Sequence, residues 1–569
     1  MTAAIRPAAR VSGVSAYRVP GHPAPVDLDL RGNEGAVPDE GLLRALAGVD
    51  ILRRYPDVSP FRGRLAARYG VSEDRVLVTA GGDDALDRLC RAVLEPGRSL
   101  LLPTPGFEMT CRYARLAGAS VVEVPWPGAV FPLEALRNAI DGTIGLIALT
   151  SPNNPTGATI PWAAISDVCD AAAAVGAVVL LDLAYVEFAD VDPTAAALAR
   201  DNVVVVRTVS KAWGLAGIRV GFALGPARIL SWMAAAGAPY AVSAPSLALA
   251  EAALDAGDAS MVEFVAGVRT GRSALAEALS AAGCDVVPSE ANFVFARSAQ
   301  AAWLADGLAG LGIGVRTFPS RPGLENALRV AVPPTATARE RLLDGLASVA
   351  RPEALLLDMD GVLVDVSRSY RAAIVAAGAA FGVRITEDDI RRIKASGDAN
   401  NDWIVTRRLV QAAGVDVALD AVKAAFESAY QGAPGRPGLR HQERLLADRP
   451  LLDSLAEHLR LGIVTGRPRA DAERLLDQAG WMDRFEVVVC MEDGPAKPDP
   501  APVQLALAKL GVASAWMVGD TPDDIRAARA AGVVPLGLLA PGDRDPAPLA
   551  SAGAARVVSG LPSLLEMLP

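Results

Sequence analysis

Short runs of β-branched and leucine residues alternate along this chain with alanine-rich amphipathic stretches. VVVVRTV (203–209) and ALLLD (354–358) are two such runs, and polar residues end or follow each of them. Apolar runs separated by helical patterns are typical of parallel sheets covered by helices. With 569 residues the chain is too long for one hydrophobic core, since single cores stop growing at roughly 250–300 residues. We therefore expect an α/β protein with two or three domains.

A change of pattern near residue 350 predicts the main domain boundary. The helical pattern ARERLLDGLASVA stops before Pro352, and a new apolar strand follows Glu353. We place a first domain over 1–350 and a second over 351–569, and both carry the α/β pattern.

Composition narrows the classes of function. Hydrophobic residues are 51% of the chain and charged residues 21%, a balance typical of a globular protein. The net charge is −10, and no block of Lys and Arg residues suggests a nucleic-acid site. We therefore expect small-molecule substrates and no nucleic acid. The five cysteines are scattered and form no C-x-x-C pair, which favours a reducing cytoplasm. The most apolar run, 171–181, is too short to cross a bilayer, so we expect no membrane insertion.

Four polar residues of the first half follow predicted strands. They are Lys211 in RTVSKAWGLAGIRVG, Asp182 and Tyr185 in VVLLDLAY, and Asn154 in SPNNPTG. A lysine at a strand end can form a Schiff base with an aldehyde cofactor. A carboxylate on a pyridine nitrogen makes that ring an electron sink, while a tyrosine and an asparagine can hold its phenolic oxygen. Singly, each residue is more often a surface lysine, a helix cap or a turn.

Two further groups of residues suit anions. The stretch VLVTAGGDDALDRL predicts a strand, a glycine turn and a helix, with Gly82, Asp83 and Asp84 at the helix start, where backbone N–H groups can bind a phosphate. Arg316 and Arg329 could converge on a carboxylate or phosphate, because each presents a planar fork of donors. The alternative for the arginines is a pair of surface salt bridges.

In this order, the segments resemble the fold-type I pyridoxal-phosphate (PLP) aminotransferases over roughly residues 15–345, and most closely the histidinol-phosphate aminotransferases. The resemblance implies a mixed, mostly parallel sheet with helices on both faces, and a small subdomain from about 1–45 and 255–350. It implies that Lys211 is the Schiff-base lysine and Asp182 the partner of the ring nitrogen. The other implied cofactor ligands are Gly82, Asp83, Asp84, Phe107, Asn154, Tyr185, Thr208, Ser210 and Arg219.

The same resemblance implies a homodimer and a substrate anchor. In that family the tyrosine of an R-Y-P-D segment reaches the cofactor phosphate of the partner subunit, and RRYPD here supplies Tyr55. Arg329 is implied to anchor the substrate's α-carboxylate or phosphate, with Arg316 assisting and Tyr17 as a further candidate. The chain has D-L-A-Y for D-E-A-Y, N-E-G-A-V for N-E-N-P, and Thr110 for a second aromatic residue. These departures leave the amino donor and acceptor open.

Four motifs of the second half share one chemistry. They place Asp358 and Asp360 in ALLLDMDG, Thr465 in IVTGRP, Lys497 in GPAKPDP, and Asp520 and Asp524 in MVGDTPDD. Two carboxylates in one pocket suit a nucleophile beside a general acid/base. Singly, the hydroxyl is more often a cap and the lysine more often solvated.

These motifs resemble the haloacid dehalogenase superfamily of phosphatases over about residues 353–569. The resemblance implies that Asp358 attacks phosphorus, that Asp360 acts as acid and base, and that Thr465 and Lys497 neutralise phosphoryl oxygens. Mg2+ would bind Asp358, the carbonyl of Asp360 and Asp520, with Asp524 in support.

Helical pattern over 367–450 fits a cap inserted into a core of 351–366 and 451–569. Within this cap, KASGDANNDW (394–403) is a polar cluster, for which substrate contact and a hinge turn are both open.

The pairing of the two halves suggests consecutive steps, because a histidinol-phosphate aminotransferase makes a phosphate monoester. We expect imidazole-acetol phosphate and glutamate to give histidinol phosphate and 2-oxoglutarate, and the second domain to hydrolyse a phosphate monoester such as histidinol phosphate. One alternative is another phosphorylated amino compound of specialised metabolism, and another is PLP-dependent decarboxylation of a phospho-amino acid. A pair of binding modules without catalysis is a third, which the complete set of site residues disfavours.

Overall fold

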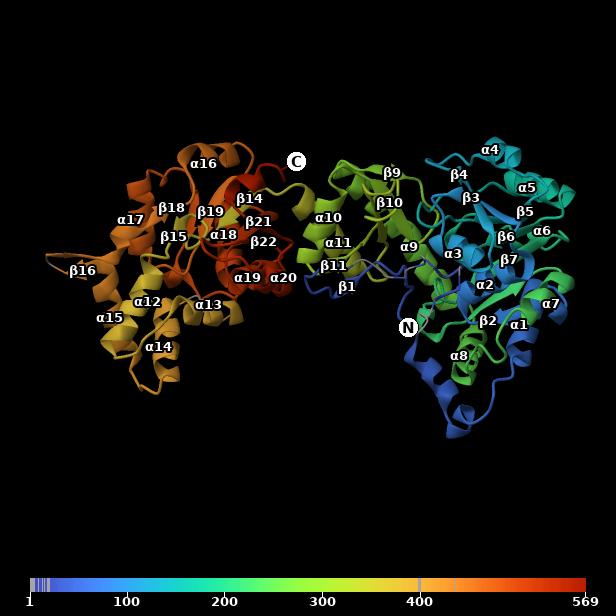
Figure 1. Cartoon of the computed structure of the whole chain (residues 1–569), viewed down its shortest axis with the longest axis horizontal. Helices are drawn as coiled ribbons and strands as arrows, with labels where there is room; N and C mark the ends of the chain where they lie inside the picture. Colours follow the sequence, from blue (N-terminus) through green and yellow to red (C-terminus); the bar gives the residue numbers. More distant parts are fainter. Residues whose placement is uncertain are drawn as a thin grey trace, which may run out of the picture. The chain divides into compact units, whose positions relative to one another are not determined.

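The computed structural model describes residues 6–8, 10–12, 14, 16–17, 21–397, 401–433 and 435–568. Packing divides the chain into two compact units. The first comprises 1–20, 30–298 and 316–340, and the second comprises 21–29, 299–315 and 341–569. Three short segments of the N-terminal 350 residues therefore group with the C-terminal half, while the boundary at 350 stays a prediction. Figure 1 labels the elements of both units.

The first unit contains a seven-stranded sheet in the order β2-β8-β7-β6-β5-β3-β4. Its strands are β2 (Val76–Thr79), β3 (Ser99–Thr104), β4 (Ser120–Pro125), β5 (Ile144–Thr150), β6 (Val178–Asp182), β7 (Val203–Thr208) and β8 (Gly221–Leu224). Strand β8 is antiparallel to β2 and β7, and the remaining neighbours are parallel. The predicted mixed, mostly parallel sheet is confirmed.

Helices cover both faces of this sheet. They are α1 (Ser59–Tyr69), α2 (Gly81–Val93), α3 (Glu108–Leu116), α4 (Leu133–Asn138), α5 (Trp162–Ala174), α6 (Thr194–Ala197), α7 (Ala227–Ala235) and α8 (Ala244–Asp255). Helix α9 (Ala259–Ala281) packs instead against a smaller sheet of the same unit. Leu180 and Val204 lie in one apolar cluster, whereas their chain neighbours Leu181 and Val205 lie in another. Successive strand residues point to opposite faces, so both faces are buried, which explains the uninterrupted apolar runs.

A smaller antiparallel sheet in the first unit has the order β12-β13-β10-β9. Its strands are β9 (Asp285–Val287), β10 (Phe293–Arg297), β12 (Arg316–Thr317) and β13 (Ala327–Ala331). Strand pairing puts Arg316 directly opposite Arg329.

The second unit contains a six-stranded parallel sheet in the order β20-β19-β14-β21-β22-β23. Its strands are β14 (Ala354–Leu357), β19 (Arg460–Val464), β20 (Val487–Val489), β21 (Ala515–Gly519), β22 (Val534–Leu538) and β23 (Arg556–Val558). The accompanying helices are α16 (Arg449–Ala456), α17 (Arg469–Ala479), α18 (Ala501–Leu510), α19 (Pro522–Ala530) and α20 (Ala547–Ala552). This sheet confirms the α/β prediction for the second half.

Segments from before residue 350 pack within the second unit. They are β1 (Leu28–Asp29), α10 (Ala301–Gly310), β11 (Ile313–Gly314) and the later part of α11 (Ala336–Ala350). Trp303 of α10 meets Trp516 of β21 with ring centroids 4.9 Å apart. Arg556 of β23 forms an ion pair with Asp306 of α10 at 2.6 Å.

Four helices lie between the short paired strands β15 (Val364–Asp365) and β18 (Arg444–Leu445). They are α12 (Tyr370–Ala380), α13 (Glu387–Ser396), α14 (Asp402–Ala412) and α15 (Leu419–Gln431). We call this helical insertion the cap. Of its polar cluster 394–403, residues 398–400 lie outside the described residues, while Lys394 pairs with Asp402 at 3.0 Å. Within the described parts of the chain, no helix has the length and apolarity that crossing a bilayer requires.

Candidate active sites

The first candidate site lies where strands β5, β6 and β7 end. Asp182 is the last residue of β6, Thr208 is the last residue of β7, and Asn154 follows β5. Because these strands are parallel, their carboxyl ends meet at one edge of the sheet. Asp182 is buried, and burial raises the pKa of its carboxyl to about 7. A protonated or cation-paired Asp182 is therefore favoured at neutral pH.

Lys211 lies against a segment from far earlier in the chain. Its Nζ donates to the carbonyl oxygen of Gly32 at 2.9 Å and lies 5.7 Å from the ring centroid of Tyr185. Asn33 Nδ2 donates to the hydroxyl oxygen of Tyr185 at 3.2 Å. A Cβ on Gly35 would lie 2.1 Å from the carbonyl oxygen of Lys211, so only glycine permits this approach. Sequence reasoning named Tyr185 and Lys211 and missed Asn33, whose signal is the G-N-E segment.

The structure brings the predicted phosphate ligands to the start of α2. Arg219 adopts a left-handed backbone with φ 53°, and its Nη2 lies 3.2 Å from Asp83 Oδ2. Gly81 has φ 81°, and a Cβ there would lie 2.8 Å from Arg219 Nη2. Thr208 Oγ1 donates to Ser210 Oγ at 2.7 Å. Gly81, the residue before Gly82, has the left-handed backbone at this helix start, and the assignment of Gly82 to the phosphate stays a prediction.

The Asp84 carboxylate serves the helix itself. Its Oδ2 accepts from the backbone N–H of Ala80 at 2.8 Å, and its Oδ1 accepts from Arg88 Nε at 2.8 Å. These contacts leave the backbone of the turn, rather than this side chain, for an anion.

Two predicted substrate residues, Tyr17 and Arg316, line a cavity of about 1260 Å³ beside β12, whereas Arg329 is not part of its lining. Its lining includes Tyr17, Glu108, Arg112, Arg316 and Arg321. Arg316 Nη2 lies 3.5 Å from Glu108 Oε1, whereas Arg316 Nη1 is buried and has no hydrogen-bond partner among the residues that the structure describes. Several guanidiniums around one carboxylate leave the cavity cationic, which suits an anionic substrate.

Arg329 connects this region to Asn154. Its Nη1 donates to Asn154 Oδ1 at 2.6 Å, and its Nη2 donates to the carbonyl oxygen of Arg31 at 2.7 Å. Burial, with the charge of Arg316 in support, lowers the pKa of Arg329 to about 10. A buried guanidinium next to another cation is stabilised by an anion, which this pair of arginines could share.

The two aromatic residues predicted to bind the cofactor differ in their exposure to solvent. Phe107 is half-buried at the start of α3 and packs against an apolar cluster. Tyr55 is 80% exposed and stacks on Tyr240 at a ring-centroid distance of 4.5 Å.

The residues of the first site fit PLP. The site offers a buried carboxylate for the ring nitrogen, a lysine for the aldehyde, and an arginine with two hydroxyls near a helix start for the phosphate. The D-L-A-Y departure does not alter this set, since Leu183 lies in the apolar core.

The second candidate site lies at the ends of three adjacent strands of the parallel sheet. Asp358 follows β14, Thr465 follows β19 and Asp520 follows β21. Lys497 Nζ donates to Asp358 Oδ1 at 2.7 Å and forms an ion pair with Asp524 Oδ1 at 2.5 Å. Burial raises the pKa of Asp358 to about 7, the charges of Asp524 and Asp360 add to the shift, and Lys497 opposes it.

Three carboxylates of this site could hold a metal ion. One oxygen each from Asp358, Asp520 and Asp524 lie within 4.8 Å of one another. Burial raises the pKa of Asp520 strongly, with Asp524 and Asp358 contributing. A Cβ on Gly361 would lie 2.1 Å from Asp520 Oδ2, so glycine is needed here. An oxygen-only ligand set with a net negative charge fits Mg2+.

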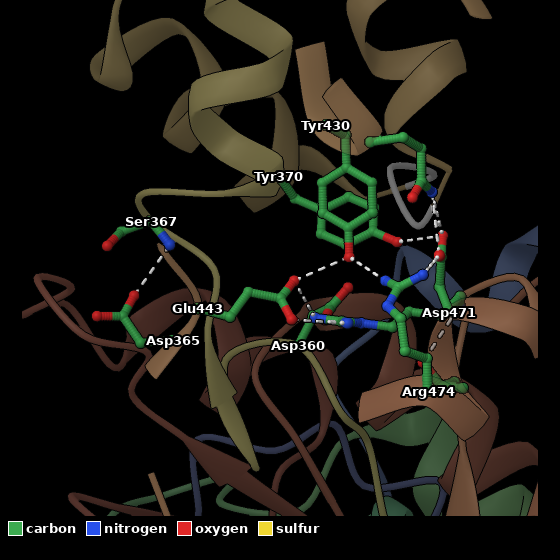
Figure 2. A network of polar contacts seen from close by, with 11 residues as sticks. Asp360, Asp365, Ser367, Tyr370, Tyr430, Glu443, Asp471 and Arg474 are labelled. Carbon is green, nitrogen blue, oxygen red and sulfur yellow. Dashed lines mark hydrogen bonds and ion pairs between the residues drawn. The ribbon is translucent and has the colours of Figure 1, made fainter. Parts of the chain in front are cut away.

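Asp360 lies outside this carboxylate group and contacts a residue that prediction missed. Arg467 Nε donates to Asp360 Oδ1 at 2.6 Å, and Arg467 Nη2 pairs with Glu443 Oε1 at 3.1 Å. Figure 2 shows Asp360 and Glu443 in one polar network with Tyr370 and Tyr430 of the cap. Thr465 Oγ1 accepts from the backbone N–H of Arg467 at 3.2 Å. The T-G-R tripeptide is the local signal that could have pointed to Arg467.

Comparisons with known proteins match two consecutive stretches of the chain, each containing one of the two candidate sites. Residues 45–346 match the family described as aminotransferase class I and II, and residues 352–532 match haloacid dehalogenase-like hydrolase. A histidinol-phosphate aminotransferase from Xanthomonas campestris pv. campestris (strain B100) is 37% identical over 306 residues, which cover 52% of this chain and 84% of the relative.

An imidazoleglycerol-phosphate dehydratase from Phytophthora nicotianae is 44% identical over 237 residues, which cover 38% of this chain and 52% of the relative. This chain thus spans about half the length of that relative. The crystal structure of histidinol-phosphate aminotransferase from Sinorhizobium meliloti in complex with pyridoxal-5'-phosphate matches with a TM-score of 0.54 and 25% identity, covering 61% of this chain and 97% of the other.

Proposed function

This chain belongs to the class I and II aminotransferase family and also carries a haloacid dehalogenase-like hydrolase domain, and we propose that it transaminates a phosphorylated substrate and hydrolyses a phosphate monoester. The proposed first reaction converts imidazole-acetol phosphate and glutamate to histidinol phosphate and 2-oxoglutarate. The proposed second reaction converts histidinol phosphate and water to histidinol and inorganic phosphate.

One observation carries the transamination proposal. Asp182, Lys211 and Tyr185 lie at one sheet edge, next to Arg329, which already contacts Asn154 at 2.6 Å. PLP bound there supplies an electron sink. Asp182 would hold a proton on the ring nitrogen, and Lys211 Nζ would move the proton at the substrate α-carbon. Arg329 and Arg316 would bind the substrate's anionic groups, and the relation to histidinol-phosphate aminotransferases supports a phosphorylated substrate.

The phosphatase proposal rests on Asp358 and Asp360. An oxygen of Asp358 attacks phosphorus while the bond from phosphorus to the leaving oxygen breaks, and Asp360 gives its proton to that oxygen. Water then attacks the phosphorus, gives a proton to Asp360, and releases Asp358 and phosphate. Lys497 Nζ lies 2.7 Å from Asp358 and would neutralise phosphoryl charge with Thr465. Mg2+, held by Asp358, Asp520, Asp524 and the carbonyl of Asp360, would supply further positive charge.

We also propose a cytoplasmic homodimer in which Tyr55 reaches the cofactor phosphate of the partner subunit. The 80% exposure of Tyr55 supports this assignment. The five free cysteines fit a reducing compartment.

The test supplies purified protein with PLP, Mg2+, glutamate and imidazole-acetol phosphate, and follows 2-oxoglutarate and phosphate separately. Wild type should form both products, whereas Asp358→Asn should form 2-oxoglutarate and no phosphate. An absence of 2-oxoglutarate would refute the proposed amino acceptor. Phosphate release that persists in Asp358→Asn would refute the proposed nucleophile.

A further inference from the structure

Arg467 is a buried arginine to which the proposed mechanism gives no role. It follows Thr465 by two residues in the loop after β19, and its side chain is 0% exposed. A buried guanidinium costs stability unless its donors are paired, so its partners indicate its role.

The donors of Arg467 are divided between the carboxylates of Asp360 and Glu443. Nε donates to Asp360 Oδ1 at 2.6 Å. Nη1 donates to Glu443 Oε2 at 3.3 Å, and Nη2 donates to Glu443 Oε1 at 3.1 Å. The fork therefore binds Glu443 through two parallel hydrogen bonds while its remaining edge holds the predicted acid/base residue.

Glu443 belongs to the segment that returns from the cap to the core. It directly precedes β18, and its Oε1 accepts from the hydroxyl of Tyr430 in α15 at 3.0 Å. The guanidinium of Arg467 also lies over the ring of Tyr370 in α12, at 4.8 Å from the ring centroid. One side chain thus joins Asp360 to two cap helices and to the cap's return segment.

We propose that Arg467 is a positioning residue for phosphate-ester hydrolysis, an inference that rests on the proposed phosphatase function. Arg467 Nε holds Asp360 Oδ1, which leaves Oδ2 to exchange a proton with the leaving oxygen. Such an exchange requires the heavy atoms to approach to roughly 2.6–3.2 Å, so a freely rotating carboxylate would lose rate. The contact with Glu443 makes this orientation depend on how the cap is seated.

A purely structural ion pair would not need Asp360. Arg467 and Glu443 already form a neutral, buried pair, since their side chains are 0% and 6% exposed. The additional partner is 25% exposed and makes the shortest contact of the three, at 2.6 Å. A second carboxylate on one guanidinium is therefore better explained by orientation of Asp360 than by packing.

The test compares two leaving groups on the full-length protein with Mg2+. p-Nitrophenolate leaves p-nitrophenyl phosphate without needing a proton, whereas the alkoxide of an unactivated alkyl phosphate needs one from Asp360. Arg467→Gln should lower kcat/KM about 100-fold on the alkyl phosphate and far less on p-nitrophenyl phosphate. The ratio kcat/KM reports departure of the leaving oxygen and not the later hydrolysis, in which Asp360 serves both substrates alike. Arg467→Lys should restore part of the loss. Arg449→Gln, which removes an exposed ion pair with Asp483 in the same unit, serves as the control with both rates unchanged.

Equal losses of kcat/KM on the two substrates would overturn the positioning role. So would a further large loss when Arg467→Gln is added to Asp360→Asn, because the arginine would then act without Asp360. A wild type that releases phosphate from neither ester overturns the proposed phosphatase function itself. Melting temperatures of the metal-free variants show whether each variant folds. The decrease in the double variant should be smaller than the sum of the decreases in Arg467→Gln and Asp360→Asn. If Arg467→Gln does not fold, Glu443→Gln tests the proposal in its place. We then expect a loss of kcat/KM on the alkyl phosphate alone, and equal losses on both substrates would contradict the positioning role.

Discussion

Lys211 donates a hydrogen bond from its ammonium to the carbonyl oxygen of Gly32 at 2.9 Å, across 179 residues of chain. The contact places the N-E-G-A-V segment beside the proposed cofactor lysine. Gly35 and Gly214 permit the approach, because a Cβ on Gly35 would lie 2.1 Å from the Lys211 carbonyl oxygen and a Cβ on Gly214 would lie 2.0 Å from the Ala36 carbonyl oxygen. The segment thus supports the turn that carries Lys211.

Gly35→Ala should therefore weaken cofactor binding. The added methyl group must displace backbone, and overpacking of this kind typically costs about 1–3 kcal/mol. We expect PLP affinity, measured by absorbance titration, to fall about tenfold or more. Gly128→Ala is the matched control, since its Cβ would meet nothing within 4 Å. Equal affinities in the two variants would show that the segment does not support Lys211.

The burial of Asp182 should make the PLP-free protein lose stability as pH rises. The pKa of Asp182 is raised from 3.8 to about 7, so the folded state retains a proton that the unfolded state releases. The contribution of the Asp182 proton to stability is fully present below about pH 4 and is lost as pH rises through about 7. The shift corresponds to an upper limit of about 4 kcal/mol.

Asp182→Asn should remove this penalty while abolishing transamination. In urea unfolding of PLP-free protein, the variant should be more stable than wild type at pH 8 and should match it near pH 4. Asp201→Asn, an exposed aspartate of the same unit, should leave the pH dependence unchanged. If the stability difference between Asp182→Asn and wild type does not grow from pH 4 to pH 8, the buried-carboxylate account is wrong.

The ends of strands were the most predictable parts of both sites. Asp182, Asp358 and Asp520 each follow an apolar run, and parallel strands bring such residues to one sheet edge. Local sequence does not tell which distant segments meet there. Asn33 reaches Tyr185 across 152 residues, and Arg467 reaches Asp360 across 107. Neither contact leaves a periodic signal.

The packing of α10 with the C-terminal sheet could not be predicted from the sequence either. The apolar composition of α10 indicates burial without indicating a partner. The tertiary structure supplies that partner, because Trp303 packs on Trp516. The sequence also does not tell which of the adjacent glycines Gly81 and Gly82 adopts a left-handed backbone at the start of α2. The structure shows that Gly81 does.

The acidic cluster of the second site should make Mg2+ a stabilising ligand. Oxygens of Asp358, Asp520 and Asp524 lie within 4.8 Å of one another, and Lys497, paired with Asp358 and Asp524, supplies one positive charge for three carboxylates. Mg2+ should therefore raise the melting temperature of wild type, because it binds the folded state alone. Asp520→Asn should melt at or above the metal-free wild type and should lose the Mg2+-dependent increase. Asp477→Asn, at an exposed position of α17, should keep that increase, and its loss there would point to a nonspecific ion effect.

Shared active sites predict that two inactive variants will complement each other. Lys211→Ala removes the proposed catalytic lysine of its own subunit, and Tyr55→Ala removes the proposed phosphate ligand of the partner's site. A mixed dimer would then contain one site with both an intact Lys211 and an intact Tyr55. Random pairing of co-expressed chains makes half of the dimers mixed, so transaminase activity should reach about one quarter of wild type. Sedimentation analysis should show that each preparation is dimeric. Two outcomes would show that Tyr55 serves no neighbouring subunit: mixed-dimer activity no greater than the sum of the two separate variants, or a wild type that sediments as a monomer. The stacking of the exposed Tyr55 ring on Tyr240 at 4.5 Å would then be the whole role of this residue.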